Sequence, residues 1–541
     1  MTPERSRRAV ALVLTLLSVS LMLANHYYGH RSYLDRLNTN HTLYHPAAPW
    51  SQAEPAVPVL ARRVWVLILD GLREDAADGL PTIGRLSVRG VRRTLRSEFP
   101  TFTYPNLTTM VTGVPPVLSG VRLNEGRPGV PLDGLYDVAR RAGLPAFVTN
   151  WSHFTEALDR ENADFLVQQK MDLAHLLSRA PTREMAWVHF EEIDEAGHRY
   201  GAASGEYAEA AQRGDALLGR MSEALDLEQD VLIALSDHGH RKRGGHGAIE
   251  PEVQAAFFLA VGAHVSRGVR LPERPMRDVA ATVAALAGIA PPRDGLGVPM
   301  LDGFNLMPDR AARVLAPAFA QRAHSDAALG AEIVDQDRKL TDTLSAGKAA
   351  AIVPALERLA ERSTQREAKF TALMKQRQMR RLAWAALPLL FMAGVSIIAY
   401  RGGVLRPRPR DLIPILTYVL LFLGMYFTLG YALSWSVPRG AFSFTAETAA
   451  MGFLAAVPAV LVRRLPMVGR ERNLEQASTV LLLWGLYILA VGAAGHDPAW
   501  LESPRVSFLL VFLSTIEFYA AGLLAVLALS TLLPRSLRKQ A

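Results

Sequence analysis

Long uncharged apolar runs stand near both ends of the chain, and shorter alternating patterns lie between them. The first run, Ala9–Asn25, is just long enough to cross a bilayer as a helix, which takes about 17–25 residues. We therefore predict an N-terminal membrane anchor over residues 1–25. Five more runs of about 19–28 residues each, with at most one acidic side chain apiece, predict a five-helix transmembrane domain over residues 381–541: Leu382–Tyr400, Leu412–Trp435, Phe442–Val462, Ala477–Gly495 and Val506–Leu533.

The first run also has an interpretation as a cleaved signal peptide. No clear small-residue cleavage site follows it, so an uncleaved anchor is favoured. Both interpretations export the residues that come next. These begin with a Pro-containing segment, residues 26–61, which we read as a linker.

Basic residues mark one side of the predicted membrane region. The loops and termini on that side hold 14 of them, against only Arg439 and Arg505 in the opposite short loops. Since cytoplasmic loops are rich in Lys and Arg, both termini are expected in the cytoplasm and the large segment between the first two spans on the exported side. In a bacterial cell that side is the periplasm. The 14 residues are Arg5, Arg7, Arg8, Arg401, Arg406, Arg408, Arg410, Arg463, Arg464, Arg470, Arg472, Arg535, Arg538 and Lys539.

The exported segment, residues 62–305, alternates short β-type runs with helical patterns. This alternation predicts an α/β domain with a mostly parallel sheet flanked by helices. Residues 306–380 are rich in Ala, Arg, Glu and Gln and predict a helical connector, most simply a solvated stalk. The expected strands are 64–71, 147–150, 186–190, 230–239 and 255–262, and the clearest expected helices are 206–225 and 278–289.

Composition narrows the chemistry. The 541 residues include no cysteine, which excludes disulfides, thiolate metal sites and thiol nucleophiles. The formal net charge of +8 is smaller than the number of basic residues on the predicted cytoplasmic side, so nucleic-acid binding is not expected.

Acidic, histidine and threonine side chains gather at the ends of the predicted strands. Asp70 ends the first strand, Asp237 and His238 end another, and His246 lies between glycines. Asp194 and His198 are four residues apart, a spacing that lets two side chains face one metal ion. Thr103 precedes a predicted helix, Tyr104–Val111, where a hydroxyl can help to hold phosphate, although a lone Thr there is more often a helix cap.

Three aspartates and three histidines at one edge of a sheet suit two divalent ions. Charges buried together without partners are prohibitively costly, so such a cluster needs cations. A structural ion-pair network would instead place Arg or Lys among them, and these motifs hold none at the key positions.

The motifs LDG, TYPN, D-x-x-G-H and SDHG followed by G-x-H-G, in this order, resemble those of the alkaline phosphatase superfamily. Within it, the type I phosphodiesterase/nucleotide pyrophosphatase branch is most similar, over about Val64 to Gly303. The stretch HFEEIDEAGH and the layout of one anchor, an exported domain and several C-terminal spans also resemble glycosylphosphatidylinositol ethanolamine phosphate transferases.

The resemblance implies two zinc sites and a threonine nucleophile. It assigns Asp194, His198 and His246 to one ion and Asp70, Asp237 and His238 to the other, with Thr103 as nucleophile and ligand at the second. Asn124 falls where the family has an asparagine that donates to a phosphate oxygen. His240 matches no ligand position and is interpreted as a surface residue. Leu107 stands where a sulfatase would need arginine, which counts against that activity.

Two functions remain open at this point. The first is an exported phosphodiesterase or pyrophosphatase that forms a phosphothreonine intermediate on a soluble diester. The second is a phosphoethanolamine-type transferase or lipid phosphodiesterase with a membrane-linked substrate, which would account for the C-terminal spans. A diester is favoured over a monoester because Asn124 is neutral, although Arg122 lies nearby in sequence. A scaffold with an inactive domain is disfavoured because all expected ligands and Thr103 are present.

Overall fold

The computed structural model describes most of the predicted exported segment. Described are residues 57–122, 124, 132–149, 173–178, 180–328, 335–366 and 412–429, with a few single positions in 368–372 and 436–455. The chain divides into two units, Leu37–Ala372 and a second that combines Met1–Arg36 with Leu373–Ala541.

An eight-stranded sheet forms the centre of the unit Leu37–Ala372 and runs in the order β3-β4-β1-β5-β6-β2-β7, with β8 paired to β2. Strands β3, β4, β1 and β5 are parallel, while β6 runs antiparallel to both of its neighbours. The mostly parallel sheet expected from the sequence is therefore confirmed. The strands are β1 (Arg63–Leu69), β2 (Gly90–Arg96), β3 (Ala146–Thr149), β4 (Glu184–Phe190), β5 (Val231–Leu235), β6 (Ala255–Gly262), β7 (Val269–Arg270) and β8 (Arg274–Pro275).

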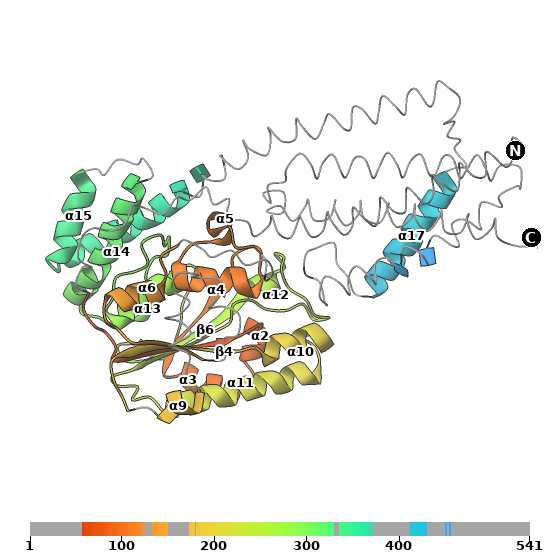
Figure 1. Cartoon of the computed structure of the whole chain (residues 1–541), viewed down its shortest axis with the longest axis horizontal. Helices are drawn as coiled ribbons and strands as arrows, with labels where there is room; N and C mark the ends of the chain where they lie inside the picture. The colour runs from red at the N-terminus through yellow and green to blue at the C-terminus, as the bar shows by residue number, and fades with distance from the viewer. Residues whose placement is uncertain are drawn as a thin grey trace, which may run out of the picture. The chain divides into compact units, whose positions relative to one another are not determined.

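Helices cover both faces of this sheet (Figure 1). On one face lie α3 (Pro81–Ser87), α9 (Leu173–Ser178) and α11 (Gly205–Glu223); on the other lie α4 (Thr103–Thr112), α6 (Leu135–Arg141) and α13 (Asp278–Ala287). The continuous apolar run of β1 is buried on both faces, as expected of a central parallel strand. Its Trp65, Leu67 and Leu69 share a core cluster with Leu218 and Met221 of α11.

Strand β2 is the main element that the sequence pattern did not predict. Two buried arginines, Arg92 and Arg93, interrupt its apolar residues. The Arg92 guanidinium lies 4.7 Å over the Phe257 ring, and Arg93 donates to Asp302 at 2.9 Å. Long side chains can cover apolar surface while their charged ends find partners, so a strand with arginines can still be buried.

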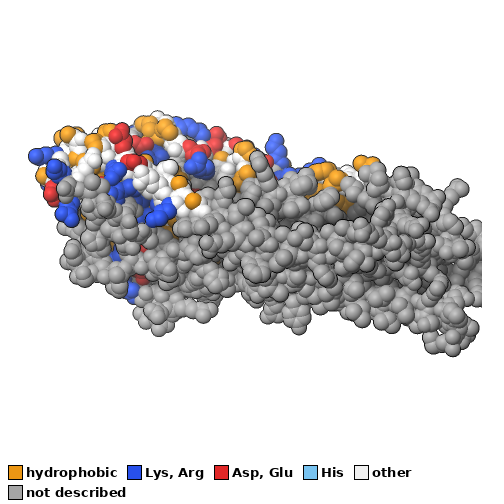
Figure 2. All heavy atoms as spheres, turned by 90° about the horizontal axis from the view of Figure 1, so that it is seen from above, with side chains coloured by type: hydrophobic (Ala, Val, Ile, Leu, Met, Phe, Trp, Pro, Cys, Tyr) orange, Lys and Arg blue, Asp and Glu red, His pale blue; other side chains and the backbone are white. Residues whose placement is uncertain are grey.

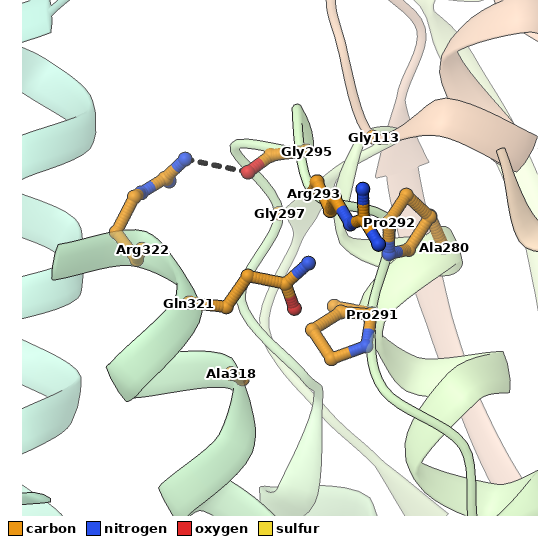
Figure 3. Close-up of a pocket in the computed structure, with 11 residues that line it drawn as sticks. Gly113, Ala280, Pro291, Pro292, Arg293, Gly295, Gly297, Ala318, Gln321 and Arg322 are labelled. Atoms are coloured by element: carbon orange, nitrogen blue, oxygen red, sulfur yellow. Dashed lines mark hydrogen bonds between the residues drawn. The ribbon is translucent and has the colours of Figure 1, made fainter. Parts of the chain in front are cut away.

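Residues 308–366 form a packed helical unit, which differs from the expected solvated stalk. Helices α14 (Pro308–Ala328) and α15 (Asp335–Ser345) and the helical residues 352–366 share a cluster of buried apolar side chains. Arg322 of α14 donates to the backbone oxygens of Gly295 and Leu296, each at 2.6 Å, and thereby joins this unit to the loop after α13. A small pocket lies at this junction, with Gln321 and Arg293 among its lining residues (Figure 3).

Charged side chains of both signs are mixed with apolar ones on the described part of the face shown in Figure 2. Basic side chains are therefore not segregated on this described surface.

Most of the predicted membrane region lies outside the described residues. This holds for the anchor 1–25, for most of the linker 26–61, and wholly or largely for the spans 382–400, 442–462, 477–495 and 506–533. The span 412–435 is partly described as α17 (Leu412–Thr428), an apolar helix. Within the described residues, none of the helices combines the length and hydropathy needed to cross a membrane.

Candidate active site and metal centre

The predicted site residues lie together at the carboxyl edge of the sheet, although they come from five separate segments. Asp70 directly follows β1, Asp237 and His238 follow β5, and Asp194 lies in α10 (Glu192–Tyr200), which follows β4. In open α/β sheets ligands bind at this edge, because the loops after parallel strands meet there. Thr103 is the first residue of α4.

A first cluster surrounds Nε2 of His238. This atom lies 3.2 Å from Thr103 Oγ1, 3.2 Å from Asp237 Oδ2 and 3.5 Å from Asp70 Oδ1. The other ring nitrogen of His238, Nδ1, is 3.1 Å from the Gly239 carbonyl oxygen and can donate to it. That tautomer leaves the Nε2 lone pair facing the carboxylates. Asp70 Oδ1 and Asp237 Oδ2 are buried and have no hydrogen-bond partner among the described residues.

A second cluster contains Asp194, His198 and His246. Nε2 of His198 is 2.9 Å from Nε2 of His246. The two oxygens of Asp194 lie 3.4 Å from these nitrogens, Oδ2 from His198 and Oδ1 from His246. Nδ1 of His246 is 2.8 Å from the Thr101 carbonyl oxygen, so its Nε2 is again free to act as a ligand. The clusters are adjacent, since the rings of His238 and His246 stack with centroids 3.7 Å apart.

The described side chains include two overlapping groups that could hold metal ions, one of Asp70, Asp237 and His238 and one of Asp194, His238, His240 and His246. Zinc–nitrogen and zinc–oxygen bonds of about 2.0–2.1 Å place neighbouring ligands of a tetrahedron about 3.3 Å apart. The separations in both clusters, 2.9–3.5 Å, scatter around that value. The buried, unpartnered oxygens of Asp70 and Asp237 also need positive charge nearby.

The electrostatics of the cluster agree with this need. Burial and the nearby Asp237 and Asp194 raise the pKa of Asp70 well above its usual value. Burial also favours the neutral form of Asp194, but His198, His246 and His240 outweigh it and hold the pKa of Asp194 well below its usual range. Cations at the two clusters would offset the mutual repulsion of these carboxylates.

Asn124 lies beside the first turn of α4, next to Thr103. Its Oδ1 accepts a hydrogen bond of 2.9 Å from the backbone N–H of Tyr104, the second residue of α4. The exposed side chain thus occupies the N-terminal end of the helix that begins with Thr103. Its Nδ2 group can donate to a phosphate oxygen bound there.

Two residues that sequence reasoning did not select shape the loop before Thr103. The buried Asn106 side chain accepts from the backbone N–H of Glu98 and donates to backbone oxygens of residues 98, 100 and 102. Thr101 Oγ1 donates to the Ala248 oxygen at 2.8 Å and accepts from the Gly247 N–H at 2.9 Å. The TYPN motif contains Asn106, but its spacing alone does not reveal that role.

The interpretation of His240 as a surface residue is wrong. Its side chain is completely buried, and its Nε2 lies 2.7 Å from Asp194 Oδ1. The ring fits against Gly71 and Gly197, where a Cβ atom would come within 3.0 Å of it. The polar run that contains His240 suggested exposure, whereas glycines from two distant segments make the space that buries it.

His189, at the end of β4, was also not selected. Its Nε2 lies 2.8 Å from Asp70 Oδ2, and its Nδ1 lies 3.1 Å from Glu191 Oε1. Burial lowers the pKa of His189, but its bonds with Asp70 and Glu191 outweigh that effect and raise the pKa to about 10.

A mostly parallel α/β domain that gathers Asp, His and Thr side chains at the carboxyl edge of its sheet has the architecture of a metal-dependent enzyme. Residues 64–128 and 130–252 match the family model for type I phosphodiesterase/nucleotide pyrophosphatase. This match supports placing residues 64–252 in the alkaline phosphatase superfamily, as expected from the motifs. That family consists of enzymes that act on phosphoesters, so the predicted enzyme class is confirmed for this domain.

Among curated proteins, the chain is similar to GPI ethanolamine phosphate transferases. The chain is 24% identical over 283 residues to the catalytic subunit of human GPI ethanolamine phosphate transferase 2, covering 46% of this chain and 28% of that protein. It is 26% identical over 324 residues to the corresponding human transferase 3, covering 52% and 30%. The chain thus spans less than a third of the length of these relatives. Among solved structures, murine ectonucleotide pyrophosphatase/phosphodiesterase 5 matches with 16% identity and a TM-score of 0.36, covering 42% of this chain and 95% of that one.

Proposed function

We propose that this chain is a membrane-anchored enzyme that cleaves a phosphodiester through a covalent phosphothreonine on Thr103. The observation that supports this most is the convergence of Thr103 Oγ1, Asp70 Oδ1 and Asp237 Oδ2 on Nε2 of His238. A hydroxyl among buried carboxylates and a histidine is poorly suited to a structural role. It is well suited to nucleophilic attack once cations balance the charge.

The residues of the two clusters divide into two ligand sets. Asp70, Asp237 and His238 would hold one divalent ion together with Thr103. Asp194, His198 and His246 would hold the other ion, and the donor set suits Zn²⁺. When bound, the ions supply positive charge that lowers the pKa of the Thr103 hydroxyl and stabilises the departing oxygen.

Thr103 carries the reaction in two displacements. Its hydroxyl loses a proton to solvent, Oγ1 forms a bond to phosphorus, and the ester bond to the leaving group breaks. The leaving oxygen then takes up a proton from water. In the second displacement an acceptor oxygen attacks the same phosphorus and releases Thr103. The acceptor is water in a hydrolase and a substrate hydroxyl in a transferase.

The N-terminal end of α4 and Asn124 would hold the transferred phosphoryl group. The helix end presents positive partial charge to the phosphate oxygens, and the Asn124 amide can donate to one of them. Because Asn124 is uncharged, the site suits the single negative charge of a diester better than the double charge of a monoester.

Two substrate classes follow from the two kinds of relative. The phosphodiesterase/pyrophosphatase family favours hydrolysis of a nucleotide-like diester. The transferase relatives favour a phosphoethanolamine-type transfer to or from a lipid-linked substrate. In either case the predicted topology puts the catalytic domain on the exported side and both termini in the cytoplasm.

The purified full-length chain and its Thr103→Ala variant test the nucleophile. With bis(4-nitrophenyl) phosphate as a substrate, Thr103→Ala should lower turnover at least 1,000-fold, an order of magnitude set by losing covalent catalysis. Zinc content and the unfolding temperature should stay close to wild type. The matched control is Thr364→Ala, an exposed threonine in the helical residues 352–366. Equal turnover in wild type and Thr103→Ala contradicts the proposal.

A second measurement separates the substrate classes. Wild type is incubated with a nucleotide diester or with phosphatidylethanolamine vesicles, and the products are identified by mass spectrometry. Release of free nucleotide alone supports the hydrolase. Diacylglycerol, formed only when wild type and an acceptor lipid are present, supports the transferase.

A further inference from the structure

The three aspartates of the site share one arrangement. Each has one carboxylate oxygen held by a hydrogen-bond donor of the protein, while its other oxygen faces a ligand histidine. Asp237 Oδ1 accepts from the backbone N–H of Gly71 at 3.1 Å. The donors for Asp70 Oδ2 and Asp194 Oδ1 are the side chains of His189 and His240, at 2.8 Å and 2.7 Å.

We propose that His240 and His189 are positioning residues, one for each metal site, and that neither binds metal. His240 orients Asp194, and His189 orients Asp70. The proposal rests on the two-metal centre proposed above. The eight residues considered so far are the six ligands, Thr103 and Asn124. His240 and His189 differ from them because they act only through Asp194 and Asp70.

Measured to the same aspartates, His240 and His189 lie closer than the proposed ligand histidines, which are 3.4–3.5 Å from Asp70 and Asp194. Within the first cluster and between Asp194 and its two ligand histidines, donor atoms lie 3.2–3.5 Å apart, as expected for neighbours around one ion. The contacts of His240 and His189, at 2.7 Å and 2.8 Å, have the length of a charge-assisted N–H···O hydrogen bond. An N–H that donates to a carboxylate has no lone pair left for a metal at the same nitrogen.

The surroundings of His240 hold it in this orientation. The ring lies between Gly71, after β1, and Gly197, in α10, and a Cβ at either position would meet the ring at 2.9 Å or less. Its Nδ1 is buried and has no hydrogen-bond partner among the described residues. The bond to Asp194 is thus the polar contact that the described structure gives to this side chain.

His189 is held from two sides. Its Nε2 contacts Asp70, while its Nδ1 contacts Glu191, the residue that precedes α10. The side chain of His189 is buried, so it links Asp70 to the half-exposed Glu191. With Oδ2 held in this way, Asp70 presents Oδ1 to His238.

Glutamine and asparagine distinguish positioning from ligation. The amide nitrogen of Gln reaches about as far as Nε2 of His, so His240→Gln and His189→Gln can still donate to the aspartates. The shorter Asn ends near the position of Nδ1, so His240→Asn and His189→Asn cannot. Both replacements are polar and of similar size, which makes folding of the pair comparable. The exposed His175→Asn in α9 is the matched control.

The readout is zinc binding by the full-length chain, measured as metal content and by competition with a chelator. Loss of a hydrogen bond to a metal ligand usually weakens metal affinity about 10–100-fold. We expect each Asn variant to lower the affinity for one of the two ions by that factor. Each Gln variant should keep most of the affinity of wild type. The His175→Asn control should bind two ions as wild type does.

Backgrounds with one site disabled assign each histidine to its site. In Asp237→Asn the remaining ion is the one at Asp194, so adding His240→Asn should weaken it and adding His189→Asn should not. In the His198→Ala background the remaining ion is the one at Asp70, so adding His189→Asn should weaken its binding and adding His240→Asn should not.

Asn variants that bind both ions as tightly as wild type would overturn the proposal. Gln variants as weak as the Asn variants would also overturn it, since that result identifies a ligand. A wild-type chain that binds no zinc contradicts the metal centre itself.

Discussion

Replacing Gly197 by alanine should have two opposite effects on stability, a gain in helix propensity and a loss from overpacking. Gly197 lies inside α10, where alanine is ordinarily favoured over glycine by about 1 kcal/mol. In this structure, however, the new Cβ would lie 2.6 Å from Nε2 of His240 and 2.7 Å from its Cδ2. Ordinary contact begins at about 3.4 Å, so either the ring or the helix must move by about 0.8 Å.

The ring has little room for that movement, because Gly71 packs on it as well. Overpacking of this kind costs about 1–3 kcal/mol, which exceeds the gain in helix propensity. We therefore expect Gly197→Ala to destabilise the metal-free chain by about 1 kcal/mol. For a domain of this size that lowers the unfolding temperature by about 2–4 °C. A ring displaced by about 0.8 Å also loses its 2.7 Å bond to Asp194, so zinc affinity should fall as well.

A double-mutant cycle isolates the contact. When His240→Ala removes the ring, Gly197→Ala should become stabilising by about 1 kcal/mol, because only the helix propensity remains. The assay is thermal unfolding of the purified chain after removal of metal with EDTA. Gly84→Ala in α3 is the matched control, since a Cβ there meets nothing within 4 Å and should stabilise in both backgrounds. The same shift for Gly197→Ala with and without the His240 ring would refute the reasoning.

Two further predictions concern metal and pH. EDTA should abolish turnover and Zn²⁺ should restore it, with two equivalents bound per chain by elemental analysis; a stoichiometry below two would count against paired ions. Asp230→Asn should destabilise the domain by about 3–5 kcal/mol at pH 7, because it leaves the buried Arg63 without its charged partner, at 2.6 Å. Burial favours neutral Asp230, but Arg62 and Arg63 outweigh it and lower the pKa of the carboxyl. This contribution is therefore complete above the ordinary pKa of about 3.9 and is lost as pH falls through the lower folded-state pKa. The difference in unfolding temperature between wild type and Asp230→Asn should shrink toward zero in strong acid; a difference unchanged between pH 7 and pH 2 would contradict it.

The buried strands were predictable because their apolar runs are nearly continuous. β1, β4, β5 and β6 lie within one or two residues of the β-type runs in their sequence, apart from the polar end of the run 230–239. β2 was not predicted, because its arginines find partners on other elements. A local pattern carries no information about such distant partners.

The sequence also allowed part of the candidate site to be predicted, but not all of it. Strand ends and motif order were enough to select Asp70, Thr103, Asp194 and the other predicted residues, and the structure gathers them. The histidines that donate hydrogen bonds to these carboxylates, His189 and His240, could not be selected from the sequence in the same way. His240 lies in a run of polar residues, and its burial depends on Gly71 and Gly197, which are far away in sequence. Asn106 shapes its loop through backbone contacts that have no motif of their own.

Thr101 connects the segment that precedes Thr103 to the loop of residues 246–248 through four hydrogen bonds. Its carbonyl oxygen accepts from His246 Nδ1, its Oγ1 bonds to residues 247 and 248, and its N–H donates to the Gly247 oxygen. Thr103 lies only two residues further along the chain. The proposed nucleophile Thr103 and the proposed metal ligand His246 are therefore placed by one short piece of backbone. If the loop that carries His246 moved, for example on loss of the proposed ion, the movement would pass through Thr101 to Thr103. The position of Thr103 Oγ1 relative to the phosphorus atom would then change.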